Sequence, residues 1–291
     1  MSDAATDTAT RTGFLLAAGI TRAAAKSFYF ASHFLPGKTK QAAYAIYAIC
    51  RLSDETVDTG GPEGAAARIR GMERRIACAY DGSATEEPLV LAFRKTVETY
   101  RIPRRYFDQL IEGMRMDVSK TRYRDFGELY AYCYRVAGVV GLIMCKVFKG
   151  DTHDAQEAAV HLGIAMQLTN ILRDIKEDFA RARVYLPQEE ILAWGVSEED
   201  IRRGEITVSM KGLLQSQISR ARDYYAKAER GIKLIPARRY RLVICLMSRI
   251  YAGILQAIED AGYDVFSRRA TVSYVGKIAI AFKVITKGDY L

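Results

Sequence analysis

The sequence is poor in the residues that interrupt or cross-link a chain. Its 291 residues include 6 prolines, 22 glycines and 1 tryptophan, and long stretches contain neither proline nor glycine. A β-sandwich needs many turns, so this scarcity argues against one and favours long helices. Charged residues make up 26% of the chain, close to the usual share for a globular protein, so extensive disorder is not expected.

Cysteine and histidine are too few for a disulfide framework or a zinc site. The 5 cysteines form no CxxC pair, and the 3 histidines lack the spacing of zinc proteases. Most of the cysteines lie in apolar stretches, where a free cysteine behaves as a small hydrophobe. The sequence therefore predicts a reduced, cytoplasmic protein.

Long apolar runs are also missing. The segment VAGVVGLIMC between Arg135 and Lys146 is far shorter than the roughly 20 residues of a membrane-spanning helix. The N-terminal segment carries Asp3 and Asp7 where a signal peptide has positive charge. We expect no transmembrane anchor, and we expect residues 1–12 to form a disordered tail.

The formal net charge of +9 raises the question of an anionic partner. Lysine and arginine are scattered along the chain, and no zinc-finger, RNP or basic-zipper pattern is present, so nucleic acid is not expected. A phosphorylated small molecule or an anionic membrane surface accounts for the excess equally well.

Apolar residues recur mostly at helical spacing, and no convincing alternating strand is found. The pattern predicts a single all-α domain over residues 13–291. Its expected helices cover residues 13–34, 39–58, 64–80, 87–100, 104–117, 125–148, 153–178, 188–193, 197–203, 208–233, 237–262 and 270–286.

Acidic side chains follow an unusually apolar helix near the start of the chain. The segment QAAYAIYAI (41–49) has one polar amide, yet Asp54, Glu55 and Asp58 come soon after it. Asp54 and Asp58 are four residues apart and share one helical face, whereas Glu55 points off that face. Arg51 lies about one turn before Asp54.

A second segment, AMQLTNILRDIKED (165–178), repeats this arrangement. Asn170, Asp174 and Asp178 are spaced by four and line one stripe, and Arg173 adjoins Asp174. Such pairs are common on solvated helix faces, but both helices are too apolar to be surface helices. Like charges 4–6 Å apart repel by about 3–4 kcal/mol at an effective dielectric of about 20. A cationic partner is therefore expected.

Magnesium suits this chemistry because it prefers oxygen ligands and commonly bridges one or two carboxylates to phosphate oxygens. Two acidic stripes flanked by arginines would hold a diphosphate through Mg²⁺, with Mn²⁺ as an alternative. The apolar helix bodies would enclose a hydrocarbon tail. The residues alone thus favour a lipid diphosphate as the ligand.

Several segments resemble the squalene/phytoene synthase family, in the family's order, from about residue 21 to 286. The segments are SFYFASHFLP, DETVD, YCYRVAGVVG and NILRDIKEDFARARVYLP. Two others, IEGMRMDVSKTRYRDFGELY and SEEDIRRGEIT, are similar to phytoene synthases in particular. Thr56 and Lys176 depart from the usual pattern, where leucine and glycine are common.

The resemblance implies an isoprenoid-synthase helical bundle around a central cavity. It implies Mg²⁺-dependent, head-to-head condensation of two geranylgeranyl diphosphates through a cyclopropyl intermediate to phytoene, with release of diphosphate and without NADPH. A relative that uses farnesyl diphosphate to make dehydrosqualene, presqualene diphosphate or squalene is the alternative. A class I terpene cyclase and a non-catalytic relative are less favoured, because the DIKED and VAGVVG segments and all four aspartates are intact.

The resemblance also implies roles for individual residues. The expected metal ligands are Asp54, Asp58, Asn170, Asp174 and Asp178. The expected substrate-binding residues are Ser27, Phe28, Arg51, Gln167, Asn170, Arg173, Tyr251 and Arg268. Tyr132 is expected near the reacting carbons, where it joins the four aspartates as a catalytic residue, although Tyr134 competes for that role. The rings of Phe28 and Tyr47 are candidates to stabilise carbocations.

Two further expectations concern the hydrocarbon. Ser32 lies one turn beyond Phe28, and a small side chain there leaves depth for a twenty-carbon tail, although Tyr44 could close the far end. The C-terminal segment mixes apolar residues with Lys277, Lys283 and Lys287, so peripheral contact with a membrane is expected, docking on the core being the alternative.

Overall fold

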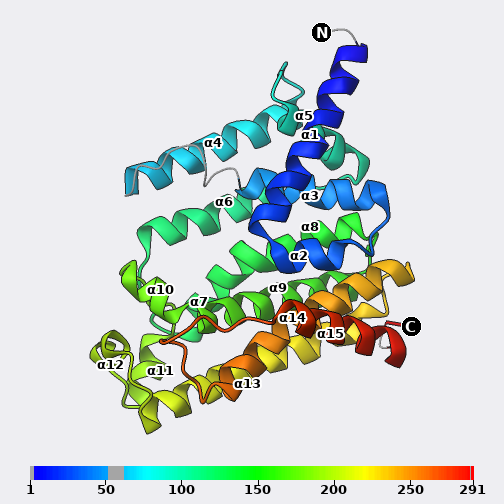
Figure 1. The fold of residues 1–291 in the computed structure, drawn as a ribbon. Coiled ribbons are helices and arrows are strands. Elements are labelled where there is room, and N and C mark those ends of the chain that lie inside the picture. The colour runs from blue at the N-terminus through cyan, green and yellow to red at the C-terminus, as the bar shows by residue number, and fades with distance from the viewer. Residues whose placement is uncertain (1–2, 52–61, 289) are drawn as a thin grey trace.

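The computed structural model describes residues 3–51, 62–288 and 290–291, and this part of the chain is almost entirely helical (Figure 1). The prediction of an all-α fold is confirmed. Apart from one isolated bridge between Arg122 and Val184, the described residues contain no β-structure. The helices are α1 (Asp3–Ala24), α2 (Lys26–Ser32), α3 (Gly37–Arg51), α4 (Pro62–Asp81), α5 (Pro88–Thr99), α6 (Arg104–Ser119), α7 (Phe126–Cys133), the π-helical turn η2 (Tyr134–Gly138), α8 (Val139–Val147), α9 (His153–Arg173), α10 (Ile175–Ala180), α11 (Gln188–Ala193), α12 (Glu198–Arg203), α13 (Val208–Ile232), α14 (Arg238–Asp260) and α15 (Tyr274–Lys287).

Helix α9 lies in the middle of the bundle. It packs against η2 and α8 on one side and against α13 and α14 on the other. Figure 1 shows α1 and α3 to α6 above α9, and α11 to α13 below it. The acidic end of α9 therefore faces short helices α10 to α12 at one end of the molecule.

Two clusters of buried apolar side chains hold these halves together. One contains Phe93 and Phe107, whose rings meet edge to face with centroids 5.0 Å apart. The other contains Leu172 and Met210 on α9 and α13. Val160 on α9 packs against both clusters, so the helix that carries the second acidic segment is anchored from two sides.

Glycines allow η2 and α8 to approach α9 closely. A Cβ atom added at Gly141 would collide with the carbonyl oxygen of Ala159, and one added at Gly163 would collide with that of Ala137. The glycines of the VAGVVG segment thus serve a close helix crossing. This crossing fixes the helix of Tyr132 relative to that of Asp174.

Three helices that the sequence predicts as continuous are each interrupted: 13–34, 125–148 and 153–178. The chain turns at Ala25, so that α1 packs on α5 while α2 packs on α14. The wider π turn of η2 follows α7 at the crossing with α9. Asp174, with φ −106° and ψ 14°, ends α9 and begins α10. Each interruption serves tertiary packing that periodicity does not encode.

The N-terminal region differs from its prediction. Residues 3–12 belong to α1, whereas the sequence predicts a disordered tail over 1–12. The hydroxyls of Thr8, Thr10 and Thr12 each donate to the carbonyl oxygen four residues earlier. Arg11 also pairs with Asp7 one turn away. The ion pair supports the helix here, and the threonine hydroxyls find their partners on the helix's own backbone.

Two described helical stretches, Phe126–Val147 and Arg238–Asp260, are long and apolar enough to cross a membrane by length and composition alone. In the bundle, η2, α8 and α14 all pack against α9. Because core helices pass the same test, this packing accounts for their apolar character.

Candidate active site

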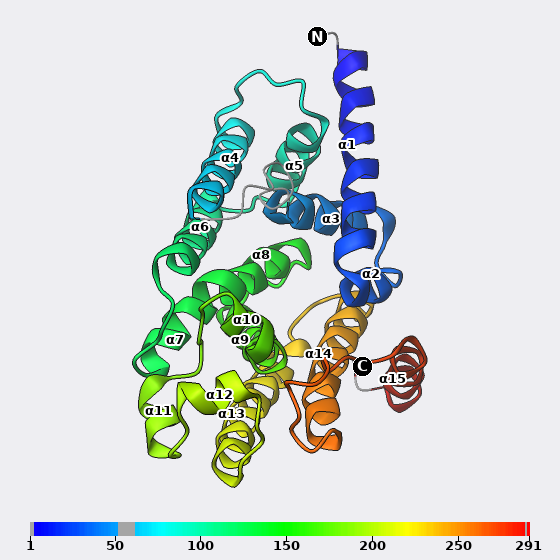
Figure 2. The ribbon, with the colours of Figure 1, turned by 60° about the vertical axis from the view of Figure 1, so that its left-hand side comes forward.

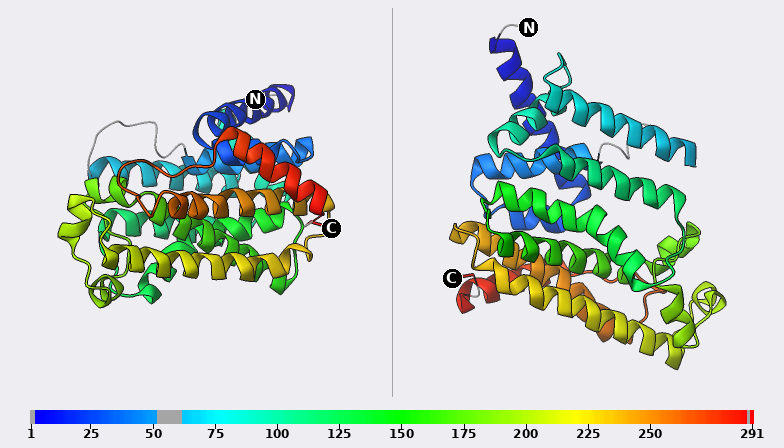
Figure 3. Two further views of the ribbon diagram at one scale, coloured as in Figure 1. Left: turned by 60° about the horizontal axis from the view of Figure 1, so that its bottom comes forward. Right: turned by 180° about the vertical axis from the view of Figure 1, so that it is seen from behind.

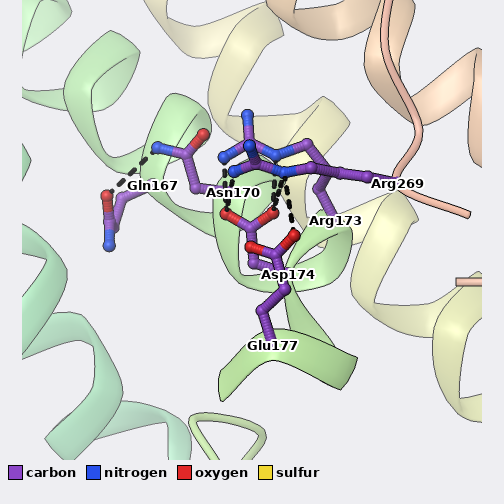
Figure 4. Close-up of polar contacts among 6 residues, drawn as sticks. All are labelled: Gln167, Asn170, Arg173, Asp174, Glu177 and Arg269. Atoms are coloured by element: carbon purple, nitrogen blue, oxygen red, sulfur yellow. Dashed lines mark hydrogen bonds and ion pairs between the residues drawn. The ribbon is translucent and has the colours of Figure 1, made fainter. Parts of the chain in front are cut away.

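Two arginines converge on the carboxylate of Asp174 at the end of α9 (Figure 4). Arg173 Nε donates to Asp174 Oδ1 over 2.7 Å, and Arg269 Nε donates to the same oxygen over 2.8 Å. Each guanidinium also donates through Nη2 to Oδ2, so both contacts are bidentate. Arg269 comes from the segment between α14 and α15 and also lies 3.6 Å from Glu177. The arrangement places two forked donors where an anion enters.

The charges of this cluster act against each other. Burial raises the pKa of Asp174, but the hydrogen bonds from Arg173 and Arg269 outweigh it and hold the pKa below its usual value. Asp174 therefore stays ionised beside the two guanidinium groups. A phosphate oxygen could replace the carboxylate on either guanidinium with the same geometry.

Asp178 lies one turn further on, and in the described part of the chain no side chain donates a hydrogen bond to it. Burial, together with the charges of Asp174 and Asp117 and against those of Arg181 and Arg183, raises the pKa of Asp178 to about 6. A small pocket lies beside it, lined by Ile171, Ile175, Asp178, Arg183, Val184, Tyr185, Leu186 and Ile201. A carboxylate at an apolar pocket beside another carboxylate is a site that a cation would stabilise.

A group of tyrosines and Asp117 lies behind this carboxylate pair. Tyr185 donates its hydroxyl proton to Asp117 Oδ1 over 2.6 Å. Tyr132 is buried, stacks on Tyr185 with ring centroids 5.2 Å apart, and directs its hydroxyl at Tyr185 and Asp117. Burial raises the pKa of Tyr132 well above its usual value, and Asp117 adds to this effect. Tyr132 therefore stays protonated and remains a hydrogen-bond donor.

Local backbone pairing explains why Tyr185 lies there. The segment after α10 runs beside the segment before α7, and Val184 N donates to Thr121 O over 2.9 Å. Gln188 N likewise donates to Tyr123 O over 2.9 Å. The ring of Tyr123 contacts those of both Tyr132 and Tyr185. Residues far apart in sequence are thus joined into one aromatic wall.

Other predicted residues lie around the Asp174 cluster. Asn170 and Gln167 contact each other one turn earlier on α9, with Asn170 Nδ2 3.4 Å from Gln167 Oε1 (Figure 4). Tyr251 on α14 is half-buried, and burial raises its pKa while the charges of Arg173 and Asp174 also act on it. The structure therefore brings Gln167, Asn170 and Tyr251 to the same region as Asp174.

The predicted residues Ser27, Phe28 and Arg51 lie on α2 and α3. Ser27 and Phe28 are half-buried on α2, and the Phe28 ring lies 6.1 Å from those of Tyr44 and Tyr47. In the described part of the chain no hydrogen bond or ring contact joins them to the Asp174 cluster. Arg51 is exposed as the last residue of α3. Asp54 and Asp58 lie outside the described residues, as do Glu55 and Thr56.

The structure adds three residues that the sequence did not single out: Arg269, Asp117 and Tyr185. Arg269 contacts Asp174. The predicted Arg268 is exposed, and its charge instead helps to lower the pKa of Asp264. The adjacent arginines gave no means of choosing between them. Asp117 belongs to the quoted segment IEGMRMDVSK, but only its position beside Tyr132 and Tyr185 indicates a role.

The described carboxylates fit a shared magnesium site but do not complete one. Among the described residues no group of three or more His, Cys, Asp or Glu side chains is placed to hold a metal ion. Asp174 and Asp178 nevertheless supply the one or two carboxylates that Mg²⁺ usually takes from a protein, and the raised pKa of Asp178 shows that Arg181 and Arg183 do not offset burial and the neighbouring carboxylates. The remaining ligands would come from phosphate and from the acidic segment around Asp54.

Comparison with known proteins places this geometry in a family. Residues 21–275 match the family model of squalene/phytoene synthase. The chain is 41% identical to the 15-cis-phytoene synthase of Synechococcus elongatus, over 87% of this chain and 86% of that one. It is also 41% identical to the chloroplastic phytoene synthase of Daucus carota, over 87% of this chain but only 64% of the longer plant protein.

The fold agrees with the sequence match. A crystal structure of a dehydrosqualene synthase in complex with ligand superposes with a TM-score of 0.90, at 27% identity, covering 97% of this chain and 98% of that one. The chain belongs to the squalene/phytoene synthase family. Members similar to it are prenyltransferases, and the resemblance inferred from the sequence motifs is confirmed.

We expect Asp178→Asn to stabilise the metal-free protein at alkaline pH. The folded-state pKa of about 6 exceeds the usual value of 3.8 for a free aspartate, so ionisation costs stability as pH rises from about 4 through 6. Because the side chain is partly exposed, the gain at about pH 8 should be about 1 kcal/mol and should vanish near pH 4. Urea unfolding at both pH values measures it.

Glu177→Gln is the matched control, since Glu177 is an exposed carboxylate on the same short helix. It should show no gain that grows with pH. Equal stability of Asp178→Asn and the unaltered protein at about pH 8 would contradict an unfavourable charge at this position.

We expect Arg269→Ala to reduce release of pyrophosphate from a prenyl diphosphate substrate by roughly 10- to 100-fold. A lost charge-assisted hydrogen bond is worth about 1.5–3 kcal/mol, and lysine lacks the forked donors that would replace it. Arg269→Lys should therefore recover little activity. Arg268→Ala should stay within about twofold of the unaltered enzyme; the reverse ranking of the two alanine variants would refute the placement.

Proposed function

We propose that the protein is a phytoene synthase that condenses two molecules of geranylgeranyl diphosphate head to head. The reaction would pass through the cyclopropyl intermediate prephytoene diphosphate and release two diphosphates. Support comes from the named phytoene synthases at 41% identity and from the family match over residues 21–275. The observation that carries the proposal is the pair of half-buried carboxylates with two arginines at the end of α9.

Binding of a diphosphate at this cluster follows from its donors. Arg173 and Arg269 each hold Asp174 through a planar fork that fits phosphate oxygens equally well. As pyrophosphate departs, negative charge develops on its oxygens, and fixed guanidinium groups stabilise that charge without reorganisation. Gln167 and Asn170 supply further polar groups one turn away.

Magnesium, with manganese as an alternative, would be held by Asp174 and Asp178 and would act as a Lewis acid on the departing diphosphate. Asn170 is a further candidate ligand, and the acidic segment with Asp54 and Asp58 would supply the opposite side. No reductant is required to form phytoene, so we propose that NADPH is not a substrate.

Tyr132 is placed to take part in proton transfer beside the carboxylates. Its hydroxyl is kept protonated by burial and by Asp117, so it can donate to pyrophosphate. Asp117 already accepts a hydrogen bond from the Tyr185 hydroxyl. The proton that the final carbocation loses as phytoene forms could therefore pass to Asp117 or to the released pyrophosphate.

The preference for twenty-carbon substrates rests on Ser32. Ser32 is fully buried, donates to Tyr29 O over 2.7 Å and lies 2.5 Å from the Tyr44 hydroxyl. Phe28, one turn earlier, packs against the same tyrosine. A small side chain at this point leaves room for a longer tail, and five more buried carbons would be worth about 4 kcal/mol. The tail cavity itself remains a prediction.

A farnesyl diphosphate-using relative is the alternative, because the similar crystal structure is that of a dehydrosqualene synthase. A class I terpene cyclase is a less favoured alternative that would share the fold. A non-catalytic relative is also less favoured, because it would have no need of the charged site. We also propose a cytoplasmic location with peripheral contact to a membrane, into which a water-insoluble product could pass.

A competition experiment tests the proposal. The purified protein receives equal amounts of geranylgeranyl and farnesyl diphosphate with Mg²⁺ and without NADPH, and chromatography identifies the extracted product. Phytoene is expected. A thirty-carbon product would select the alternative, and a cyclic terpene or no product would reject the proposal.

The same assay tests the role of Ser32. Ser32→Phe should reduce formation of the forty-carbon product at least tenfold while turnover of farnesyl diphosphate persists, because the larger ring occupies tail space. Ser32→Ala removes the hydroxyl without adding volume and should keep the preference for the longer substrate. An unchanged product ratio in a folded Ser32→Phe protein would exclude this position as the determinant.

A further inference from the structure

Helix α15 carries apolar side chains on two sides, and only one side is covered. Ala281 and Val284 are buried against the bundle, and Ile280 lies near Gly253 of α14. A second set of five side chains is exposed on the neighbouring arc of the helix. We call these residues the α15 apolar face: Tyr274, Val275, Ile278, Phe282 and Ile285.

The exposure of this face is extensive. Val275 is 74% exposed and Phe282 is 70% exposed, on a helix of 14 residues. Their spacing places them on one contiguous stripe, and the exposed Lys283 and Lys287 lie on the arc between this stripe and Ile280. Contiguous apolar exposure bordered by charge marks an interaction surface.

Acidic residues are missing from long stretches of the sequence, one of which contains α15. Three stretches of the chain, residues 8–53, 230–258 and 265–288, contain no aspartate or glutamate. Together they hold 17 of the 43 lysines and arginines. The rest of the chain therefore carries 26 basic and 34 acidic residues, so the net charge of +9 belongs entirely to these stretches.

The described parts of these stretches meet in space. Phe30 on α2 contacts Tyr274 edge to face, and Thr39 on α3 hydrogen bonds to Tyr240 on α14 over 3.1 Å. Lys26 lies close enough to Lys277 to help lower its pKa, after the larger effect of burial. Figure 2 shows α1, α2 and α15 along one edge of the molecule, and the left view of Figure 3 again shows α1 and α15 along one edge.

We propose that the α15 apolar face binds in the plane of an anionic lipid bilayer. An amphipathic helix that combines a bare apolar stripe with lysines and lacks acidic residues has the character of an interfacial helix. The surrounding acid-free stretches add long-range attraction to anionic headgroups. The face would hold the protein at the membrane, where long-chain lipids are dissolved. The benefit of this position for catalysis rests on the proposed function.

The charge pattern disfavours a second copy of this chain as the occupant. A twofold interface brings the same patch of each subunit together, so lysines on one α15 would face lysines on the other. A neutral soluble partner would leave the charge segregation without a role. An anionic bilayer complements both the apolar stripe and its positive surroundings.

Vesicle flotation tests the proposal with the full chain and no substrate. Phosphatidylcholine vesicles are compared with vesicles in which a third of the lipid is phosphatidylglycerol, at low and at high salt. The protein should float with the anionic vesicles at low salt, and binding should fall severalfold in high salt. The double variant Ile278→Glu with Phe282→Glu should lose at least tenfold in the bound fraction.

Val208→Glu is the matched control. Val208 is 92% exposed at the start of α13, which in Figure 1 lies near α12 at the opposite end of the molecule from α15. This variant should float as the unaltered protein does. Lys283→Glu with Lys287→Glu should abolish the preference for anionic over neutral vesicles.

Thermal unfolding and turnover in detergent micelles keep this test separate from folding and from the proposed function. Both should be unchanged in the Ile278→Glu, Phe282→Glu protein. Absence of flotation, or equal flotation of that variant, would overturn the proposal even if turnover is normal. A dimer detected by sedimentation and abolished by the same changes, without lipid binding, would assign the face to a second copy instead.

Discussion

The carboxylates of Asp174 and Asp178 lie at the end of a helix whose interior neighbours are apolar, and both must remain charged to hold a metal–diphosphate complex. Arg173 and Arg269 solve this for Asp174 by donating to both of its oxygens. Among the described residues Asp178 has no comparable donors, and its pKa is raised to about 6. Two guanidinium groups contact Asp174, whereas negative charge predominates around Asp178. Such a site suits a metal–diphosphate complex, which brings both a cation and an anion.

The scaffold keeps this charge cluster in register with the reacting groups. Close crossing at Gly141 and Gly163 ties α8 and η2 to α9, and so fixes Tyr132 relative to Asp174. The pairing of Val184 with Thr121 brings Tyr185 and Asp117 to Tyr132. The polar chemistry of the site is thus held by rigid packing around α9, while the segment with Asp54 and Asp58 lies outside the described residues.

Much of this organisation follows from the sequence because helical periodicity and a stripe of acids are local patterns. The helices, the Asn170–Asp174–Asp178 spacing and Arg173 could be read directly. The break at Asp174, the choice of Arg269 over Arg268, and the link from Tyr132 to Asp117 could not, since each depends on contacts between distant segments. Tyr132 is buried in the tyrosine group, whereas Tyr134 begins η2 and packs near Gly138, a distinction that two aromatic residues on one helix do not reveal.

The central claim is that diphosphate is gripped jointly by guanidinium groups and by a metal held on these carboxylates. Calorimetric titration with inorganic pyrophosphate, with and without Mg²⁺, measures this without any prenyl tail. The account predicts tight binding only when Mg²⁺ is present, and loss of the metal-dependent part in Asp174→Asn. Equal pyrophosphate affinity with and without Mg²⁺, or an unaltered metal dependence in Asp174→Asn, would contradict it.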